Sequence, residues 1–302
     1  MELSNVHRAV DAEDRNASVA FLHYGDMTNI GDFLASPQHY FDFGAQRTVL
    51  IAGGGASNNF FAKRALRHKA KVRIAWAVGQ SWPFEKVPSS IDVTLKQLLR
   101  RVTYCRASTR DPAMASLRLP LVPCPSAYHP LSELPPGTRR GIILNGNPRV
   151  SGSLAATMAS QRGQGSEKYI FATNELGVQD FTDAFSRMQI VTTNSYHAAY
   201  WGLLSGRKVH IIGYSTKFTS LAKLFGFPES AVVKCSRGDT ESLNNAIESC
   251  LHRAPLQLRS PAETRAQFRS LNLDFAERLS QVGVAAHLKP AFRQKHELAL
   301  SA

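Results

Sequence analysis

The chain of 302 residues is 43% hydrophobic and 20% charged, which is the composition of a folded globular protein rather than of a disordered or fibrous one. Lysine and arginine number 36 against 23 acidic residues, giving a net charge of +13. Such an excess favours anionic partners: phosphorylated small molecules, an acidic membrane surface or nucleic acid. No helix-turn-helix, zinc-finger or RNA-binding motif accompanies the charge, so we expect no nucleic acid partner.

Targeting and redox signals favour the cytoplasm. No stretch approaches the roughly 18–20 apolar residues that a membrane-spanning helix needs. Asp11, Glu13 and Asp14 stand where a signal peptide would need an apolar core. The four cysteines are far apart, and His, Asp and Glu do not cluster as metal ligands do, so we expect reduced thiols and no metal.

Short apolar runs alternate with longer helix-like stretches, the pattern of an α/β fold. Strands are expected at Ser18–Tyr24, Thr48–Ala52, Val72–Val78, Arg101–Cys105, Gly141–Leu144, Tyr169–Ala172, Gln189–Val191 and Lys208–Ile212. Pro135, Pro136 and Gly137 interrupt this alternation. We therefore expect two domains, 1–136 and 137–302, with a ligand site in the cleft between them.

Two helices are expected near the C-terminus. Glu241–Leu251 is amphipathic, and Pro261–Val282 has one apolar face, formed by Phe268, Leu271, Phe275 and Leu279. The second of these helices is expected to pack back on the first domain. Residues from about Lys289 onward are expected to be loosely attached.

Polar or glycine-rich turns follow several strands, at the edge where α/β proteins bind ligands. After the first strand, Asn29 and Gly31 lie in a turn whose backbone amides can face an anion, and Asp32 can cap the next helix or accept a proton. After the second strand, close approach of a ligand or of the opposing domain is allowed by Gly53, Gly54 and Gly55. These glycines match neither a Walker loop nor the GxGxxG pattern.

An arginine, Arg110, follows the fourth expected strand. Its guanidinium suits a carboxylate or phosphate because it can bind two oxygens at once. The alternative is a surface ion pair with Asp111 ahead of a helix, and such pairs contribute little. Both interpretations remain open at this point.

The densest polar junction surrounds His197, which opens a largely apolar helix. Asn194 and Ser195 precede it. A histidine in this setting can act as a general acid or base, or bind phosphate. Lys217 occupies the matching position after the next strand, where its charge can meet the same ligand.

A second group of cations lies outside these junctions and contains no acid: Lys63, Arg64, Arg67, Lys69, Lys71 and Arg73. A solvated helix face is the commoner explanation for a charge run. Contact with a membrane surface or a polyprenyl phosphate is the alternative.

Taken in order, the junctions resemble the polysaccharide pyruvyl transferase family, and within it the ketal pyruvyl transferases of bacterial exopolysaccharide assembly. The resemblance covers roughly residues 20–230 and rests on Thr28–Asp32, Gly53–Gly55, Thr109–Pro112, Asn194–His197, Tyr214–Lys217 and Leu224–Pro228. It implies two Rossmann-like halves in a glycosyltransferase-B-like arrangement. It also implies transfer of pyruvate from phosphoenolpyruvate to two hydroxyls of a sugar, with release of phosphate and without a further cofactor.

The resemblance also implies partners and a location. The acceptor would be a polyprenyl-diphosphate-linked oligosaccharide, and the enzyme would work at the cytoplasmic face of the inner membrane, which it could contact through Lys63–Arg73. Many members carry Arg-Leu-His where this chain has Ser195-Tyr196-His197. One cation is therefore missing, which leaves open whether another arginine, such as Arg207, makes its contact.

Site roles follow from combining the junctions with the resemblance. His197 and Asp32 are the expected catalytic residues, one as proton donor and the other as proton acceptor. The expected phosphoenolpyruvate contacts are Arg110, Lys217, Ser195 and Asn194. The expected acceptor or loop contacts are Asn29, Gly31, Gly53, Gly54, Gly55 and Glu175.

Two other functions compete with pyruvyl transfer. The first is a nucleotide-sugar glycosyltransferase of the same architecture, in which Glu175 would bind the ribose. The second is a non-catalytic basic protein that binds anionic lipid through Lys63–Arg73.

Overall fold

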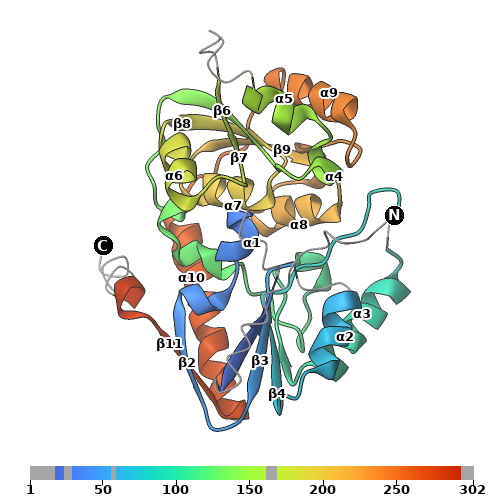
Figure 1. Cartoon of the computed structure of the whole chain (residues 1–302), viewed down its shortest axis with the longest axis vertical. Coiled ribbons are helices and arrows are strands. Elements are labelled where there is room, and N and C mark those ends of the chain that lie inside the picture. Colours follow the sequence, from blue (N-terminus) through green and yellow to red (C-terminus); the bar gives the residue numbers. More distant parts are fainter. Residues whose placement is uncertain (1–17, 24–28, 56–58, 87, 161–168, 294–302) are drawn as a thin grey trace.

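The computed structural model describes residues 18–23, 29–55, 59–86, 88–160 and 169–293 (Figure 1). Within them the chain is an α/β protein, as the alternating pattern predicts: parallel strands form two sheets, and helices pack on them. Part of the first junction, residues 24–28, lies outside the described residues.

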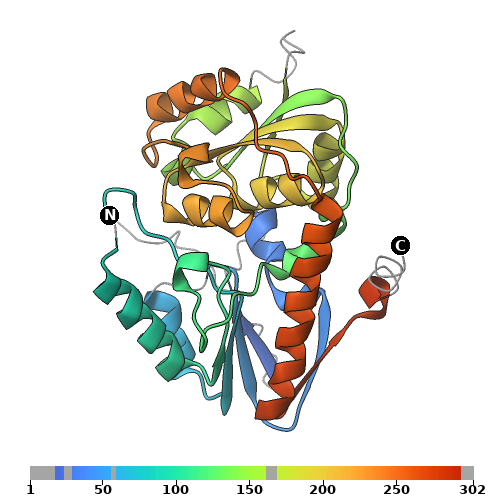
Figure 2. The same ribbon diagram turned by 180° about the vertical axis from the view of Figure 1, so that it is seen from behind.

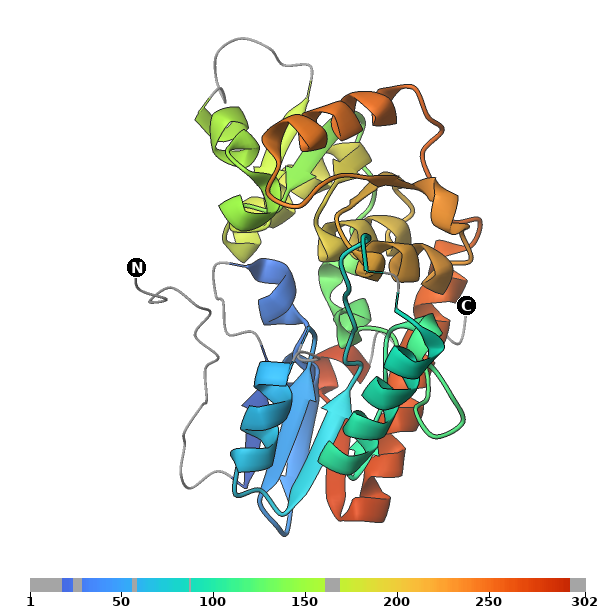
Figure 3. The ribbon, with the colours of Figure 1, turned by 90° about the vertical axis from the view of Figure 1, so that its right-hand side faces the viewer.

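The first sheet has four parallel strands in the order β1-β3-β4-β5. These are β1 (Val19–Leu22), β3 (Val49–Gly53), β4 (Val72–Trp76) and β5 (Arg106–Ala107). Its central strands are apolar and almost wholly buried because both faces are covered. On one face lie α2 (Asn59–Arg67) and α3 (Ser90–Thr103), side by side in Figures 1 and 3.

The second sheet has five parallel strands in the order β10-β9-β8-β6-β7. These are β6 (Arg139–Leu144), β7 (Ile170–Thr173), β8 (Met188–Thr193), β9 (Lys208–Gly213) and β10 (Val232–Lys234). Its helices are α4 (Pro148–Ser151), α5 (Leu154–Ser160), α6 (Val178–Ser186), α7 (Tyr196–Leu204), α8 (Thr216–Leu224) and α9 (Thr240–Leu251). Every residue of α7 is buried, so this helix forms the centre of the second core.

Short helices join or cap these elements. The α-helix α1 (Ile30–Leu34) follows β1. The 3₁₀ helices are η1 (Pro37–His39), η2 (Pro112–Met114), η3 (Pro125–Tyr128), η4 (Pro130–Ser132), η5 (Glu229–Ala231) and η6 (Leu279–Val282).

The long helix α10 (Pro261–Arg278) runs alongside both sheets (Figure 2). Its first half packs on the second core through Phe268. Further along, the side-chain oxygen of Asn272 accepts a 2.8 Å hydrogen bond from the indole of Trp76 on β4. The chain then returns as β11 (Val284–Leu288), which pairs antiparallel with β2 (Phe41–Ala45). Phe275 and Leu288 thereby complete the first core.

Two local predictions are wrong. Arg101–Cys105 is not a strand, because α3 continues to Thr103 and β5 begins only at Arg106. The helix is set by a capping box at Ser89 and Asp92 and continues through a run of good helix formers.

The second wrong prediction is that the chain is loosely attached from Lys289 onward. The segment is held in place as far as Arg293, where the described residues end. The backbone N–H of Lys289 donates to the carbonyl of Tyr40, and the ring of Phe292 lies 5.4 Å from that of Tyr40. The strands β2, β10 and β11 were not among those expected from the sequence.

Candidate active site

The carboxyl ends of both parallel sheets converge on a cavity of about 350 Å³, a volume typical of small-ligand sites. Residues that line it follow β1, β3, β4 and β5 of the first sheet and all five strands of the second. The site is therefore built from the strand ends of two sheets that face one another, with α1 between them (Figure 3).

The order of the strands in each sheet determines where the charged and the neutral side chains lie along the cavity. In the second sheet, Arg237 follows the edge strand β10, Lys217 follows β9 and His197 follows the central β8. Asn145 follows β6, and Glu175 follows β7 at the opposite edge. Neighbouring strands lie about 4.8 Å apart. The second sheet therefore presents cations at one edge, amide and carboxyl groups at the other, and a histidine between them.

The first sheet follows the same order. Arg110 comes after the edge strand β5, and Asp32 comes after β1 at the other edge. Hydrogen bonds align the two sheets: the hydroxyl of Ser220, on α8, donates to the Asp111 carboxylate at 2.7 Å, and the N–H of Ile30 donates to the Asn174 carbonyl at 2.9 Å. The cationic edges of the two sheets thus face each other, as do the edges with acids and amides.

His197 is placed by the end of β8 and the start of α7. The Thr193 hydroxyl accepts the backbone N–H of Ser195 at 2.9 Å and donates to the Ile143 carbonyl at 2.6 Å, which fixes the turn into α7. The imidazole is almost fully buried against Gly31, where a Cβ atom would lie 2.4 Å from Nδ1. Glycine at position 31 is therefore needed for the ring to occupy this place.

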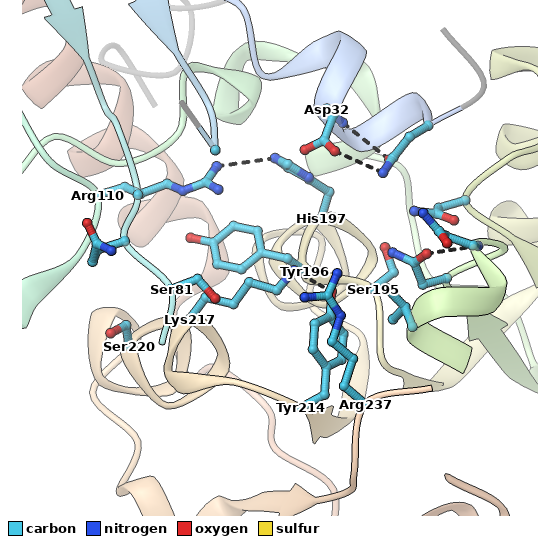
Figure 4. Close-up of a pocket in the computed structure, with 18 of the residues that line it drawn as sticks. Asp32, Ser81, Arg110, Ser195, Tyr196, His197, Tyr214, Lys217, Ser220 and Arg237 are labelled. Atoms are coloured by element: carbon cyan, nitrogen blue, oxygen red, sulfur yellow. Dashed lines mark hydrogen bonds between the residues drawn. The ribbon is translucent and has the colours of Figure 1, made fainter. Parts of the chain in front are cut away.

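Arg110 lies across the floor of the cavity and is only 7% exposed. Its Nη1 is 3.5 Å from His197 Nε2, and its guanidinium carbon is 4.3 Å from the centre of the Tyr196 ring (Figure 4). A Cβ atom at Gly79 would lie 2.7 Å from Arg110 Nε, so glycine is required there as well. Arg110 is therefore a buried cation beside the imidazole of His197 and the ring of Tyr196, and the surface ion pair with Asp111 is ruled out because both residues are buried.

The pKa of the His197 imidazole lies well below its usual value, first because the ring is buried and then because Arg110 and Lys217 are close. The ring is therefore neutral near pH 7. A guanidinium can only donate, so His197 Nε2 is the acceptor in its 3.5 Å contact with Arg110. An anion that neutralised Arg110 and Lys217 would raise the pKa of His197.

The opposite edge of the cavity carries carboxyl and amide groups. The Asn29 side chain caps α1 and also donates to the Asp32 carboxylate at 3.0 Å. The Asn174 side chain accepts the backbone N–H of Gly146 at 2.9 Å, and Glu175 lies beside it in the lining. Groups of this kind form hydrogen bonds to hydroxyls, so this edge suits a polyol.

Comparison with known protein families assigns the chain to one of them. Residues 23–216, more than half of the sequence, match the family described as polysaccharide pyruvyl transferase. The chain belongs to this family. A search of curated proteins gave no match.

Family membership makes the chain a transferase of polysaccharide metabolism. The matched range contains Asp32, Arg110 and His197, and it ends one residue before Lys217. The cationic edge beyond β9, which includes Arg237, lies outside the match.

Most of the site residues expected for a pyruvyl transferase line this one cavity: Asn29, Asp32, Gly55, Arg110, Glu175, Ser195, His197 and Lys217. Asn194 does not line it. Its buried amide accepts the N–H of Asn145 and donates to the Ser151 hydroxyl. Gly53 and Gly54 also lie outside the lining and pack against Ala35.

The missing cation of this family member is not supplied by Arg207. That side chain is fully buried, and it donates hydrogen bonds to the Ser205 hydroxyl and to the carbonyls of Leu134, Pro135, Phe185 and Met188. Arg237 instead lines the cavity, with its guanidinium carbon 5.8 Å from the centre of the Tyr214 ring.

Several lining residues were missed by the sequence analysis, chiefly Arg237, Asn145, Asn147, Asn174, Gln80, Ser81 and Ser220. Asn145 and Asn147 follow a predicted strand directly, so the same strand-end signal that selected Arg110 could have identified them. Arg237 lies in the loop after β10, a strand that was not predicted.

The basic run Lys63–Arg73 lies away from the cavity, on α2, the following turn and β4. Lys63, Arg67 and Lys71 are exposed, whereas Arg73 is half-buried. None of the helices in the described part of the chain is long and apolar enough to span a membrane.

Proposed function

We propose that the protein transfers pyruvate from phosphoenolpyruvate to two hydroxyls of a sugar in a lipid-linked oligosaccharide, forming a cyclic ketal and releasing phosphate. The observation that carries this proposal is the ordered cavity, in which Arg110, Lys217 and Arg237 gather at one edge, His197 lies in the middle and amides line the other edge.

The cationic edge matches the donor. Phosphoenolpyruvate carries a carboxylate and a phosphate on one small carbon frame, so its binding brings two anions together. Arg110 supplies a planar group for a bidentate contact, and Lys217 and Arg237 supply further positive charge. These cations offset the repulsion between the two anions and stabilise the charge that moves onto the departing phosphate.

The amide edge matches the acceptor. Asn145, Asn147 and Glu175 offer both hydrogen-bond donors and acceptors, as recognition of a sugar with free hydroxyls requires. The two hydroxyls that receive the ketal would point from this edge toward the donor. Asp32 lies on the same side and is placed to accept a hydroxyl proton.

Protonation of the donor follows from the position of His197 between the two edges. The ring is neutral in the ligand-free protein because burial, Arg110 and Lys217 lower its pKa. When the two anions of phosphoenolpyruvate neutralise those cations, the pKa of the ring rises, which favours proton uptake. His197 is therefore more readily protonated with the donor bound than without it.

The chemical steps balance without a further reactant. His197 donates its proton to the methylene carbon of phosphoenolpyruvate, which becomes the methyl group and leaves the adjacent carbon electrophilic. One sugar hydroxyl adds to this carbon and loses its proton to Asp32. The second hydroxyl then displaces phosphate, its proton leaving with the phosphate or returning to His197. No metal and no resident cofactor enters these steps.

The architecture is proposed to be of the glycosyltransferase-B type, with two Rossmann-like domains, 1–136 and 137–302, and the acceptor held on polyprenyl diphosphate. The two parallel sheets and the cavity at their facing edges support it. A lipid-linked acceptor would place the enzyme at the cytoplasmic face of the inner membrane.

The test is phosphate release from phosphoenolpyruvate, measured with and without a membrane extract that contains lipid-linked oligosaccharides. We expect release to depend on the extract and to fall about 10²–10⁴-fold in His197→Ala, the range for loss of a general acid or base. His252→Ala, an exposed histidine at the end of α9, is the control. A wild-type rate in His197→Ala would overturn the role of His197.

Glu175 supports one alternative. It lines the cavity and could bind the ribose of a nucleotide sugar. Saturable binding of a nucleotide sugar, without binding of phosphoenolpyruvate, would replace pyruvyl transfer by glycosyl transfer. In that case Glu175→Gln should weaken nucleotide-sugar binding.

A further inference from the structure

The helix α3 buries a polar side. Thr103 is 2% exposed, and Gln97 donates to the Met114 carbonyl at 3.0 Å. Arg100, also a residue of α3, is buried on this side and donates to the carbonyls of Val78 and Gly79 at 3.1 and 3.2 Å. In most amphipathic helices of globular proteins the buried side is apolar.

The outer side of α3 is apolar and exposed. Ile91 is 69% exposed, Leu95 57%, Leu98 51% and Val102 71%. Their spacing of four, three and four residues puts them in a single stripe along the helix. Leu99 widens this stripe, and among the described residues no helix or strand covers it. A contiguous apolar stripe of this length on a soluble protein marks a contact surface.

Exposed cations lie on the same helix as the stripe and on the helix beside it. Arg101 of α3 is exposed, and the neighbouring helix α2 exposes Lys63 and Arg67 together with Leu66 (Figure 1). Across the described parts of α2 and α3 the one acid is Asp92, which is engaged in the cap of α3. The surface therefore combines an apolar stripe with a nearly pure positive border.

We infer that the α3 stripe and the exposed cations of α2 form a docking surface for an anionic lipid bilayer. A helix that lies in the membrane interface needs an apolar face that enters the acyl boundary and cations that meet the headgroups. Both features are present here, side by side. A second copy of the chain fits less well, because two like-charged borders would then face each other.

The location of α3 links this surface to the cavity. Gly79, Gln80 and Ser81 line the cavity, and the chain passes from them through residues 82–89 into the first turn of α3. Docking through α3 would hold the cavity close to a lipid-linked sugar. This consequence rests on the proposed function, whereas the docking itself does not.

The experiment is co-sedimentation of the full chain with vesicles of equal parts phosphatidylglycerol and phosphatidylcholine, compared with vesicles of phosphatidylcholine alone. We expect binding to the anionic vesicles that weakens as salt is raised. In Leu95→Gln/Leu98→Gln, binding should fall at least about tenfold, because two apolar side chains leave the acyl boundary. In Lys63→Gln/Arg67→Gln it should fall roughly 25-fold, at about fivefold for each cation.

Matched controls separate docking from folding and from catalysis. Val178→Gln/Leu251→Gln changes two exposed apolar residues elsewhere and should bind like the wild type. Thermal melts check that each variant is folded. His197→Ala should also bind normally, so that a failure of pyruvyl transfer and a failure of docking are distinguishable.

Insertion of the α3 stripe into the bilayer can be followed separately, by tryptophan fluorescence. A tryptophan introduced as Leu98→Trp should emit at shorter wavelength with anionic vesicles than without them, because the stripe enters an apolar phase.

Three results would overturn the inference: no sedimentation with anionic vesicles, unchanged binding in Leu95→Gln/Leu98→Gln, or a concentration-dependent dimer that this variant abolishes. The last result would assign the stripe to self-association.

Discussion

Two buried arginines, Arg110 and Arg207, lie in regions that use a positive charge in opposite ways. The guanidinium of Arg207 is surrounded by the carbonyls of Leu134, Pro135, Phe185 and Met188 and by the Ser205 hydroxyl. Arg110 faces the cavity, with a 3.5 Å contact to His197 and the Tyr196 ring beside it. Burial does not separate the two residues, because both are less than a tenth exposed.

The partners of each guanidinium separate them. Five oxygen acceptors satisfy Arg207, so its charge holds together the segment after η4, the end of α6 and the start of β8. The neutral imidazole and the aromatic face beside Arg110 leave its donors available for an anion. A buried arginine is therefore a better indicator of a ligand site when its partners are weak than when they are many.

The largest expected effect on activity comes from Arg110, the arginine that faces the cavity. Arg110→Gln should lower the rate of acceptor-dependent phosphate release about 10²–10³-fold, because a charged donor to the transferring phosphate is lost. The melting temperature should stay near that of the wild type. Arg253→Gln, at an exposed arginine after α9, is the control for both measurements. An unchanged rate would remove Arg110 from the site.

For Arg207 we expect the reverse pattern, a loss of stability without a loss of activity. Arg207→Met leaves several buried carbonyls without a donor, and we expect it to lower the free energy of unfolding by about 3–5 kcal/mol. Activity per folded molecule should persist. Urea unfolding monitored by circular dichroism measures the loss. Wild-type stability combined with a large loss of activity would reverse the roles assigned to the two arginines.

Two histidines extend the comparison to pH. Burial lowers the pKa of His129 to about 4, and burial with Arg110 and Lys217 lowers that of His197. The unfolded chain binds protons at these histidines below about pH 6.5, while the folded chain does not, so stability should fall by about 1–3 kcal/mol between pH 7 and pH 5. Urea unfolding at both pH values tests this. In His129→Gln the loss of stability between pH 7 and pH 5 should be smaller, and the rate of phosphate release should stay near that of the wild type. An equally large loss of stability would exclude His129 as a cause of the pH dependence.

The smallest expected effect is at the rim of the cavity. Arg237 is exposed, so its contact with the donor is screened by solvent. Arg237→Gln should raise the KM for phosphoenolpyruvate about tenfold and leave kcat nearly unchanged, as loss of uniform binding does. Initial rates over a range of donor concentrations measure both. If kcat falls instead, Arg237 acts in the transition state and not only in binding.

The sequence predicts the parts of the fold that depend on apolar runs. β3, β4 and β9 are rich in buried apolar residues, and their positions were predicted to within about two residues. β2 and β11 were missed because, in the described part of the chain, each pairs only with the other and the two lie far apart in the sequence. No local signal reports a pairing between segments so distant in sequence.

The lining of the cavity was predictable where a polar residue directly follows a strand. Arg110, His197 and Lys217 were selected by this signal, and the structure brings them to one cavity. Arg207, which was considered as a replacement for the missing cation, shows what the sequence does not predict, since whether an arginine meets an anion or backbone carbonyls depends on tertiary packing. The inward polar side of α3 was missed for the same reason.

The path of α10 and β11 has a consequence for biosynthesis. The core between the first sheet and this segment joins Phe41 and Trp76 to Phe275, Leu279 and Leu288. A ribosome makes α10 and β11 long after β2 and β4, so Phe41 and Trp76 wait for these partners during much of synthesis. Nascent chains that end before α10 therefore expose these two aromatic side chains, where chaperones bind or aggregation begins.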